Sequence, residues 1–315
     1  MVETNEIACD LCGSKDSEHL FDAIDRLHGF EGRFKYVRCN SCNLVYMNPQ
    51  ISMSEVGKYY PDDYAPHKAK IRNNPKIGIL AKFRNFRKEL LSTVKILPFV
   101  KNKTGPNTKL LDVGCGGGKF LAKIRQETGC KVEGLDISKQ AVKYANENYG
   151  IDVFCGDITE APFADESFDI ITAWWYLEHV PNPSEVIQMM HRLLKTDGRC
   201  IIGVPNIESF NGKFFKNKWY HLDCPRHLFL YSPKTISEFL TKAGFDIEKT
   251  VFDKTAWGLF HSCRYFFDNK NVPLRNRKHL PGSSIIKRLM LPFTLFLSLI
   301  KKSDTMVVYA VKREC

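Results

Sequence analysis

Residues 109–121, KLLDVGCGGGKFL, decide the fold of this 315-residue chain. An apolar run that includes Asp112 leads into a glycine-rich turn, and an apolar, helix-like segment follows. Glycines at such a turn let the backbone approach a ligand closely. They also place amide groups at the start of a helix, where an open parallel sheet usually binds its ligand. The stretch therefore predicts a strand, a ligand-binding turn and a helix.

The turn departs from the fingerprint GxGxxG of dinucleotide-binding proteins. That fingerprint, beginning at Gly114, requires glycine at position 119, where this chain has Lys119, so the nicotinamide interpretation is weakened. The next predicted strand ends in Asp136, whose carboxylate is placed to accept hydrogen bonds from both hydroxyls of a ribose. The turn and this acid together predict a nucleoside ligand.

From position 109 onward the chain alternates between short apolar runs and helical segments. One helix is expected at 182–198, with Asn182 as its N-cap, Pro183 in its first position and Gly198 at its end; another is expected at 232–244. Such alternation predicts a parallel sheet with helices on both faces. The predicted strands are 110–113, 132–135, 153–155, 168–173, 200–204 and a final one at 305–311.

Five motifs carry a family resemblance, and they occur in the expected order: LLDVGCGGGKF at 110–120, GLDIS at 134–138, CGDI at 155–158, FDIITAWWYLEHVPNP at 168–183 and LLKTDGRCIIGVPN at 193–206. Over roughly 109–252 the sequence resembles the class I S-adenosylmethionine-dependent methyltransferases. The resemblance implies an α/β fold with a Rossmann-like, doubly wound, seven-stranded methyltransferase sheet. It also implies S-adenosylmethionine (SAM) as the cofactor.

The same resemblance implies a set of cofactor-binding residues. The turn glycines would hold the methionine moiety, Asp136 the ribose, and Asp157 with Ile158 the adenine. Asp157 could instead be an ordinary turn residue. Trp174, which with the next two aromatics could wall the sulfonium or the adenine, could instead belong to the core. The complete set is Asp112, Gly114, Gly116, Gly118, Asp136, Ile137, Asp157, Ile158 and Trp174.

Two CxxC pairs mark the N-terminal segment, Cys9 with Cys12 and Cys39 with Cys42. Each pair places two thiolates on one tight turn, and two such turns can close a tetrahedral zinc site with no open position. We therefore expect a structural Zn²⁺ ion in a small zinc-ribbon-like module at 1–66, with disulfides or redox thiols as the alternative. The segment is similar to the zinc-binding module ahead of some bacterial methyltransferase domains, including sugar C-methyltransferases. The residues after the core are too few for the additional domain of those sugar enzymes.

The segment 206–231, NIESFNGKFFKNKWYHLDCPRHLFLY, is crowded with aromatic and basic residues and is expected on the ligand side of the sheet. A related methyltransferase group carries a similar PRHLF-like segment. Loops over strand ends are where an acceptor should bind. His227 in this segment and His179 beside the end of the fourth strand are the candidate catalytic bases, since neutral imidazole takes a proton near pH 7. Alternatively, His179 is structural, and Arg226 and His227 only hydrogen-bond the loop backbone.

The net charge of +11 is concentrated in two segments. Residues 67–109 hold 12 Lys and Arg against one acid, and residues 270–315 hold 10 against two. A basic amphipathic helix is expected at 76–97, and 284–300 combines cations with more apolar surface than one helix face needs, as interfacial helices do. Both segments predict a peripheral enzyme on an anionic membrane surface; alternatively, both pack against the core.

Compartment follows from what the sequence lacks. The start, MVETNEIACD, has neither a basic residue cluster nor an apolar run, which argues against a secretory signal. The longest uncharged apolar stretch, 289–300, has 12 residues, whereas a membrane-spanning helix needs about 20. We expect no transmembrane segment and a cytoplasmic protein, attached peripherally to the inner face of the membrane.

The expected function is SAM-dependent methyl transfer to a small-molecule, glycan or lipid-linked acceptor. A nucleic-acid methyltransferase is an alternative, weakened because AWWYLEH stands where amino-methylating DNA and RNA enzymes usually carry an Asn- or Asp-Pro-Pro-aromatic run. A non-catalytic, zinc-bearing binding module is an alternative of another class. The expected organisation is a zinc-binding module at 1–66, a basic helix and linker at 67–108, and a methyltransferase domain at 109–315 with insertions at 206–231 and 253–303.

Overall fold

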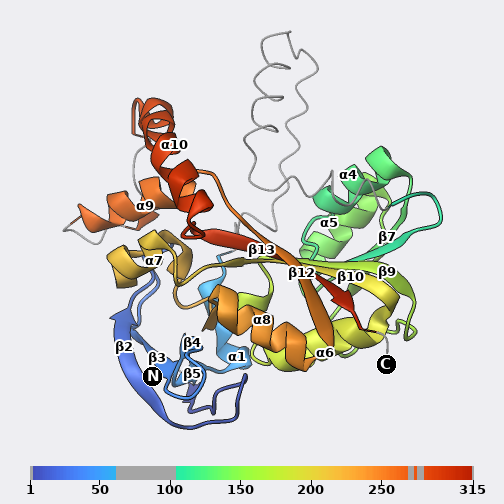
Figure 1. Cartoon of the computed structure of the whole chain (residues 1–315), viewed down its shortest axis with the longest axis horizontal. Helices are drawn as coiled ribbons and strands as arrows, with labels where there is room; N and C mark the ends of the chain where they lie inside the picture. Colours follow the sequence, from blue (N-terminus) through green and yellow to red (C-terminus); the bar gives the residue numbers. More distant parts are fainter. Residues whose placement is uncertain (1–2, 62–103, 269–272, 275–279, 314–315) are drawn as a thin grey trace.

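A seven-stranded sheet forms the centre of the computed structural model, which describes residues 3–61, 104–268, 273–274 and 280–313 (Figure 1). The order is β12-β13-β10-β9-β6-β7-β8, and β13 runs antiparallel to both of its neighbours. The predicted doubly wound, seven-stranded sheet is thereby confirmed; the amphipathic helix expected at 76–97 lies outside the described residues. The strands are β6 (Lys109–Val113), β7 (Lys131–Asp136), β8 (Val153–Cys155), β9 (Phe168–Trp174), β10 (Leu194–Pro205), β12 (Phe245–Phe252) and β13 (Thr305–Lys312).

The strand order puts the glycine turn at the switch point of the sheet. β6 lies between β7 and β9, so the chain leaves β6 toward one side and later returns to the other. Open α/β sheets bind ligands outside the carboxyl ends of their strands at such a point. We call the carboxyl ends of β6, β7 and β9, with the turns that follow them, the ligand edge.

Helices cover both faces of the sheet (Figure 1). α4 (Lys119–Thr128) and α5 (Lys139–Tyr149) lie on one face, and α6 (Pro183–Leu193) and α8 (Pro233–Lys242) lie on the other. Each pair buries an apolar stripe, as amphipathic helices on a sheet do. Leu121 of α4 belongs to one buried cluster, and Ile187 of α6 and Ile236 of α8 belong to a second one.

The helix expected at 182–198 is shorter than predicted. α6 ends at Leu193 because Leu194 already pairs with Phe168 at the start of β10, where its side chain is fully buried. Gly198 therefore lies within β10 and does not close the helix. The Asn182 side chain makes no capping hydrogen bond at the start of α6, and a residue from the N-terminal segment supplies the cap instead, as described below.

The N-terminal residues 3–61, here called the N-terminal module, form two small sheets on the same side as α6 and α8 (Figure 1). The larger sheet has the order β11-β4-β3-β2, and β11 (Phe229–Leu230) comes from the predicted 206–231 insertion. One continuous buried cluster joins these strands to α6, α8 and the central sheet. The other elements are β1 (Thr4–Asn5), β2 (Ser17–Ala23), β3 (Phe34–Cys39), β4 (Val45–Met47), β5 (Gln50–Ile51), α1 (Met53–Val56) and η1 (Gly57–Tyr59).

Helices of the two predicted insertions pack together beside the sheet. Phe210 meets Phe293 edge to face, with ring centroids 5.3 Å apart, and Phe214 packs on Phe266 at 5.8 Å. These aromatic contacts join α7, α9 and α10 into one group (Figure 1). The elements are α7 (Phe210–Phe215), η4 (Lys216–Lys218), η5 (Tyr220–Leu222), α9 (Trp257–Phe266) and α10 (Ser283–Leu299).

Candidate active site

The turn between β6 and α4 requires glycine for two reasons, its backbone angles and the space that neighbouring side chains leave. Gly114, Gly116 and Gly118 have φ of 72°, 52° and 72°, a region that L side chains rarely adopt. A Cβ atom at Gly114 would also lie 2.4 Å from the ring of Tyr176. The turn therefore holds its shape with the Tyr176 ring packed against it at the ligand edge.

Asp136 closes β7 directly opposite this turn. Its Oδ2 accepts a hydrogen bond from the Gly116 backbone N–H at 2.8 Å, and its Oδ1 accepts one from the Ser138 N–H at 2.9 Å. A carboxylate has about four acceptor positions, so each oxygen keeps a lone pair for a further donor. The arrangement fits the hydroxyl groups of a ribose, which the sequence predicted as the ligand of Asp136.

Two of the predicted cofactor-binding residues, Ile137 and Ile158, differ sharply in exposure. The apolar side chain of Ile137 is 67% exposed at the ligand edge, where it offers a flat surface to a ring. Ile158 is wholly buried in the core, so it presents no open surface to a ligand in this structure. Asp157 accepts hydrogen bonds from the Thr159 N–H and hydroxyl at 3.0 and 2.9 Å, which fits the turn role left open from the sequence.

Asp112 lies inside the sheet and faces the turn from below. Its side chain is buried and accepts a hydrogen bond from the Thr172 hydroxyl at 2.6 Å. Burial raises the pKa of Asp112 to about 8, the Thr172 hydrogen bond lowers it, and the nearby Asp136 charge raises it further. Asp112 thus ties the end of β6 to β9, rather than presenting an open carboxylate.

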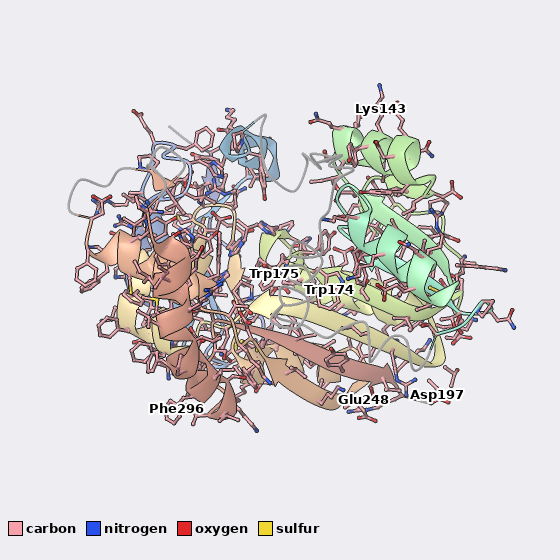
Figure 2. All side chains as sticks on the ribbon, turned by 90° about the horizontal axis from the view of Figure 1, so that it is seen from above. Lys143, Trp174, Trp175, Asp197, Glu248 and Phe296 are labelled. Atoms are coloured by element: carbon pink, nitrogen blue, oxygen red, sulfur yellow. The ribbon has the colours of Figure 1, made fainter. Side chains whose placement is uncertain are left out.

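Trp174 ends β9 and Trp175 follows it; Figure 2 labels both near the middle of the molecule. Trp174 packs toward the core, edge to face with Phe120 at 5.7 Å and against Gly203. Trp175 has φ of 53°, is 42% exposed and stacks on His221 at 6.0 Å. Trp175 is therefore more accessible to a ligand than the predicted Trp174, and Tyr176 lies closer to the turn.

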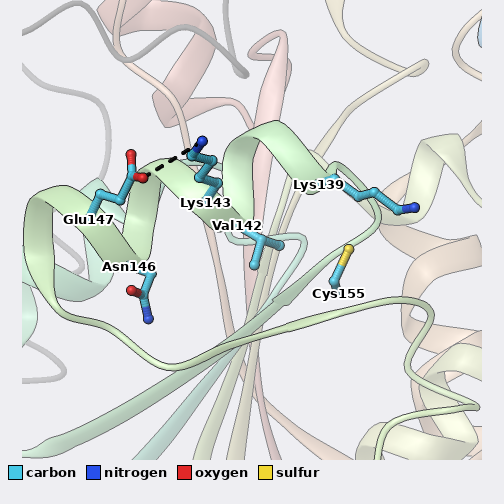
Figure 3. Close-up of a pocket in the computed structure, with 6 residues that line it drawn as sticks. All are labelled: Lys139, Val142, Lys143, Asn146, Glu147 and Cys155. Carbon is cyan, nitrogen blue, oxygen red and sulfur yellow. Dashed lines mark ion pairs between the residues drawn. The ribbon is translucent and has the colours of Figure 1, made fainter.

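A hollow of about 470 Å³ lies apart from these groups, between α5 and β8 (Figure 3). Exposed side chains of α5 form its wall, among them Lys143, which pairs with Glu147 at 3.8 Å. None of the predicted cofactor-binding residues lines it. The ligand edge is defined by its backbone and carboxylate geometry, and this hollow adds no chemistry to it.

The four predicted metal-ligating cysteines meet in the N-terminal module. Their Sγ atoms all lie within 4.8 Å of one another, with Cys9 and Cys42 at 3.4 Å and Cys12 and Cys39 at 3.5 Å. A disulfide would hold two sulfurs about 2.05 Å apart, whereas tetrahedral zinc with Zn–S bonds of about 2.3 Å separates them by about 3.8 Å. The cluster therefore fits a four-thiolate zinc ion better than it fits disulfides.

Arg226, in the predicted acceptor segment, ties that segment to the N-terminal module. Its fully buried guanidinium forms a bidentate pair with Asp25, at 2.9 and 3.0 Å, and a second pair with Asp223 at 2.7 Å. It also donates to the backbone carbonyl of Tyr59 at 2.8 Å. Nearby, the Tyr36 hydroxyl donates to the His227 carbonyl at 2.7 Å. Arg226 is thus a structural anchor, and its main partners are two carboxylates rather than the loop backbone alone that the structural alternative from the sequence expected.

The two candidate bases lie together at the ligand edge. The rings of His179 and His227 meet edge to face, 4.6 Å between centroids. The Nδ1 of His179 lies 3.0 Å from the Arg226 carbonyl, and the Nδ1 of His227 lies 2.9 Å from the His221 carbonyl. A carbonyl only accepts, so each Nδ1 carries the proton and each Nε2 keeps its lone pair. Burial lowers the pKa of His179 to about 4 and that of His227 to about 3.

Sequence reasoning missed two members of this group. Glu178 is fully buried, and within the described part of the chain neither of its carboxylate oxygens has a hydrogen-bond partner. Its Oε1 lies 4.0 Å from Nε2 of His227, and burial raises its pKa to about 8. The hydroxyl of Tyr60 lies 3.1 Å from Nδ1 of His179. Glu178 stands beside His179 in the motif LEH, but no local signal connects Tyr60 to a residue so distant in sequence.

Comparisons with known proteins relate the sequence to methyltransferases. A family model described as a methyltransferase domain matches residues 83–250. An uncharacterized protein of Methanocaldococcus jannaschii is 33% identical over 140 residues, 44% of this chain and 65% of that protein. The ubiquinone biosynthesis O-methyltransferase of Pseudomonas entomophila is 36% identical over 104 residues, 31% of this chain and 44% of that enzyme. The chain thus spans less than two thirds of the length of either relative.

A solved structure shares the fold. A Bacillus halodurans protein described as a candidate methyltransferase matches with a TM-score of 0.50 at 19% identity, covering 70% of this chain and 100% of that chain. At this level of identity the match bears on the central sheet and its helices.

Proposed function

Because the chain belongs to the family of SAM-dependent methyltransferases, whose domain its residues 83–250 match, we propose that it transfers a methyl group from SAM to a small-molecule acceptor. The observation that carries the proposal is the glycine turn facing the Asp136 carboxylate at the switch point of the sheet. Bound SAM supplies a methyl group on a positively charged sulfur; as the acceptor bonds to that methyl, the sulfur–carbon bond breaks, S-adenosylhomocysteine leaves and the acceptor's proton is released.

The proposed cofactor contacts are divided among four parts of the ligand edge. The positive-φ glycines keep side chains away from the methionine moiety, and the free lone pairs of Asp136 suit the ribose hydroxyls. The exposed Ile137 side chain would lie on the adenine ring, and Asp157, which is half-buried, would bind its edge beside the buried Ile158. Asp112 would fix the end of β6, where the turn begins, by accepting the hydrogen bond from Thr172 of β9.

His179 and His227 are the proposed proton acceptors. Burial keeps both imidazoles neutral near pH 7, so each has a lone pair at Nε2 that can take a proton from an acceptor hydroxyl. His179 is the better placed of the two, because it is only half-buried and directly follows β9. The same burial makes both groups weak bases, so transfer of the proton to Nε2 is favoured only once the forming oxygen–methyl bond has made the hydroxyl more acidic.

We propose that the acceptor is a hydroxylated small molecule with apolar character, such as a lipid-linked or quinone-like compound; a glycan acceptor is the weaker alternative. One relative is named a ubiquinone biosynthesis O-methyltransferase, which favours an oxygen acceptor. The aromatic side chains of the insertions support apolar character, because Phe210, Phe214 and Trp257 are exposed where those insertions meet.

The proposed working place is an anionic membrane surface at the inner face. α10 exposes a run of apolar side chains, with Leu289 at 75% and Leu299 at 80%, and Lys301 and Lys302 follow its end. Figure 2 shows Phe296 of this helix at the periphery of the molecule. Interfacial helices combine such a face with cations worth about 1 kcal/mol each near anionic lipid. Among the helices described here, none has the length and hydropathy to cross a bilayer.

We further propose that Cys9, Cys12, Cys39 and Cys42 hold one structural Zn²⁺. Four thiolates leave no open coordination position, so the ion would stabilise the N-terminal module without taking part in chemistry. The division into a module at 1–66, a linker at 67–108 and a methyltransferase domain at 109–315 stays part of this proposal. The pairing of β11 with β4 indicates that the module and the 206–231 insertion act as one unit.

The central experiment is transfer of labelled methyl from SAM to a cell extract that is afterwards separated into lipid, small-molecule, polysaccharide, protein and RNA fractions. Wild type should label the lipid or small-molecule fraction, and Asp136→Ala should label it at least about tenfold less, because a lost hydrogen bond to a charged acceptor costs about 1.5 kcal/mol or more. Label confined to RNA would replace the proposal with the nucleic-acid alternative. Absence of label from every fraction would favour a binding module.

Liposome flotation tests the membrane part separately. Wild type should float with anionic vesicles at low salt and sink as salt is raised, because cation attraction is screened. Leu299→Asp and Lys301→Glu should weaken binding, whereas the control Lys143→Glu on α5 should not. If wild type stays at the bottom of the gradient at low salt, the membrane proposal fails and α10 is a helix that packs against the core.

A further inference from the structure

We propose that Glu178, His179 and His227 bind a divalent transition-metal ion beside the cofactor site. The three residues lie in the segments after β9 and before β11, and one ligating atom from each lies within 4.8 Å of the others. This second metal site is distinct from the four-cysteine cluster. It goes beyond the proposed methyl transfer, and its occupancy can be measured without any catalysis.

Both histidines are held in the way that metal-ligating histidines are held. Each donates its Nδ1–H to a backbone carbonyl, that of Arg226 for His179 and that of His221 for His227. Such a hydrogen bond fixes the tautomer and the ring orientation, and it leaves the Nε2 lone pair as the ligand. In the metal-bound protein these lone pairs coordinate the ion, so the role of proton acceptor proposed above applies only to the metal-free site. The rings therefore need no change of protonation to bind an ion.

Glu178 supplies a carboxyl ligand that has no hydrogen-bond partner among the described residues. Both of its carboxylate oxygens are buried, and the residues that the structure describes offer them no hydrogen bond. A buried polar group without a hydrogen-bond partner destabilises the folded protein. A bound ion would supply the partner that the Glu178 side chain lacks. Ligand atoms about 2.1 Å from an ion lie at most about 4.2 Å apart, and Oε1 of Glu178 lies 4.0 Å from Nε2 of His227.

The surrounding charges also favour a cation. Asp223 places Oδ2 3.9 Å from Nε2 of His227, and Asp25 lies on the far side of Arg226. The Arg226 guanidinium is the positive group in this cluster, and its donors are engaged by these two carboxylates and by backbone carbonyls. Two carboxylates therefore pair with one guanidinium, and the excess of one negative charge favours a cation nearby.

The ligand set defines the class of ion. Two imidazoles and one carboxylate suit Mn²⁺, Fe²⁺, Co²⁺ or Zn²⁺, whereas Mg²⁺ and Ca²⁺ prefer oxygen ligands only. Three protein ligands also leave coordination positions open. An oxygen atom of the acceptor would occupy one of these open positions. This part rests on the proposed function, because it assumes that the acceptor enters at the ligand edge.

The test uses full-length protein with its cysteine-bound metal retained. Mn²⁺ is the probe, because a four-thiolate site prefers softer ions, and free Mn²⁺ is followed by electron paramagnetic resonance. Wild type should bind about one Mn²⁺ per chain. Glu178→Gln and His227→Gln should each weaken binding at least tenfold, as loss of one ligand requires. The control Glu208→Gln removes an exposed carboxylate near Lys302 and should bind like wild type.

Circular dichroism and SAM calorimetry complete the design. Variants that keep the wild-type spectrum and SAM affinity but lose Mn²⁺ support the site. Wild type that binds no Mn²⁺, or folded variants that bind it as tightly as wild type, overturns it. If Glu178→Gln does not fold, His227→Gln alone decides. Failure of wild type to bind SAM would instead count against the proposed function and leave the metal result standing.

Discussion

Two carboxylates at the ligand edge, Asp112 and Asp136, occupy opposite environments. Asp136 accepts two backbone hydrogen bonds and faces the turn, whereas Asp112 is buried with a single hydroxyl donor. Hydrogen bonds favour a charged carboxylate and burial disfavours it, so the two acids are suited to different tasks. Asp136 is suited to bind a ligand and Asp112 to hold the turn.

Asp136→Ala should weaken SAM binding roughly 10- to 150-fold, because hydrogen bonds to a charged acceptor are worth about 1.5 to 3 kcal/mol. The change also removes the acceptor of the Gly116 N–H, so the turn itself should loosen. Calorimetry with SAM measures the effect, and Asp165→Ala, an exposed acid away from the ligand edge, serves as the control. Unchanged affinity would remove Asp136 from the cofactor site.

Asp112→Asn should change how stability depends on pH. The pKa of Asp112 is raised to about 8 in the folded protein from 3.8, so the folded state keeps a proton that the unfolded chain releases between pH 4 and 8. Wild-type stability should therefore fall across this window, by up to about 1.4 kcal/mol per pH unit from this group. The variant lacks this contribution, so its free energy of unfolding should rise relative to that of wild type as the pH rises. Urea unfolding at pH 5 to 8 without SAM measures the free energy of unfolding of both proteins. The same dependence on pH in wild type and variant would contradict the prediction.

The ligand edge could be predicted from sequence where its signal is local. The glycines, Asp136 and the CxxC pairs can be recognised from their spacing over a few residues, because this spacing is typical of a turn or a strand end. Glu178 and Tyr60 could not be found this way, because their roles depend on contacts across the fold. His179 meets Tyr60 over 119 positions, and no periodicity in the chain reports such a contact.

At the scale of single elements, the start of α6 shows how the N-terminal module docks. The sequence predicted Asn182 as the cap, but Asp10, between the first two cysteines, takes this role. Its carboxylate accepts from the Ser184 N–H at 2.8 Å and from the Ser184 hydroxyl at 2.9 Å. A residue inside a CxxC turn thus satisfies the first turn of a helix in the methyltransferase core. A local rule for helix caps cannot find a cap supplied from 174 positions away.

Asp10→Ala should lower the free energy of unfolding by about 1 kcal/mol, the usual cost of a lost N-cap. It should leave zinc content unchanged, because the four thiolates stay in place. Urea unfolding with metal analysis measures both, and Glu6→Ala, an exposed acid of the same module, is the control. A destabilised variant that has also lost zinc would mean that Asp10 shapes the cysteine turn rather than the helix.

At the scale of the whole molecule, the N-terminal module and the methyltransferase core share one interior. The buried cluster runs from Cys9 through β3 and β4 into the central sheet, and the Arg226–Asp25 pair crosses the same boundary. The sequence predicted the two parts separately because each has its own motif. It could not predict that β11 joins the module's sheet, since two residues of strand carry no periodic signal.

Removal of the proposed zinc should therefore reach the acceptor segment. Cys39→Ser should lose the metal, lower Tm and raise hydrogen exchange at 3–61 and at 223–231, because β11 and Arg226 lose their partners. Exchange at 109–136, around the glycine turn, should change little. Metal analysis and hydrogen-exchange mass spectrometry test this. Protection kept at 223–231 in the metal-free variant would show that the segment is held by the core alone.

The pairing of β4 with β11 also orders the events of synthesis. About 180 residues separate the two strands, so a ribosome adding 5 to 20 residues per second needs about 9 to 36 seconds between them. During that interval the edge of β4, whose three side chains are buried in the finished protein, stays open to other chains. The larger sheet of the N-terminal module can therefore be completed only after residue 230 has been made.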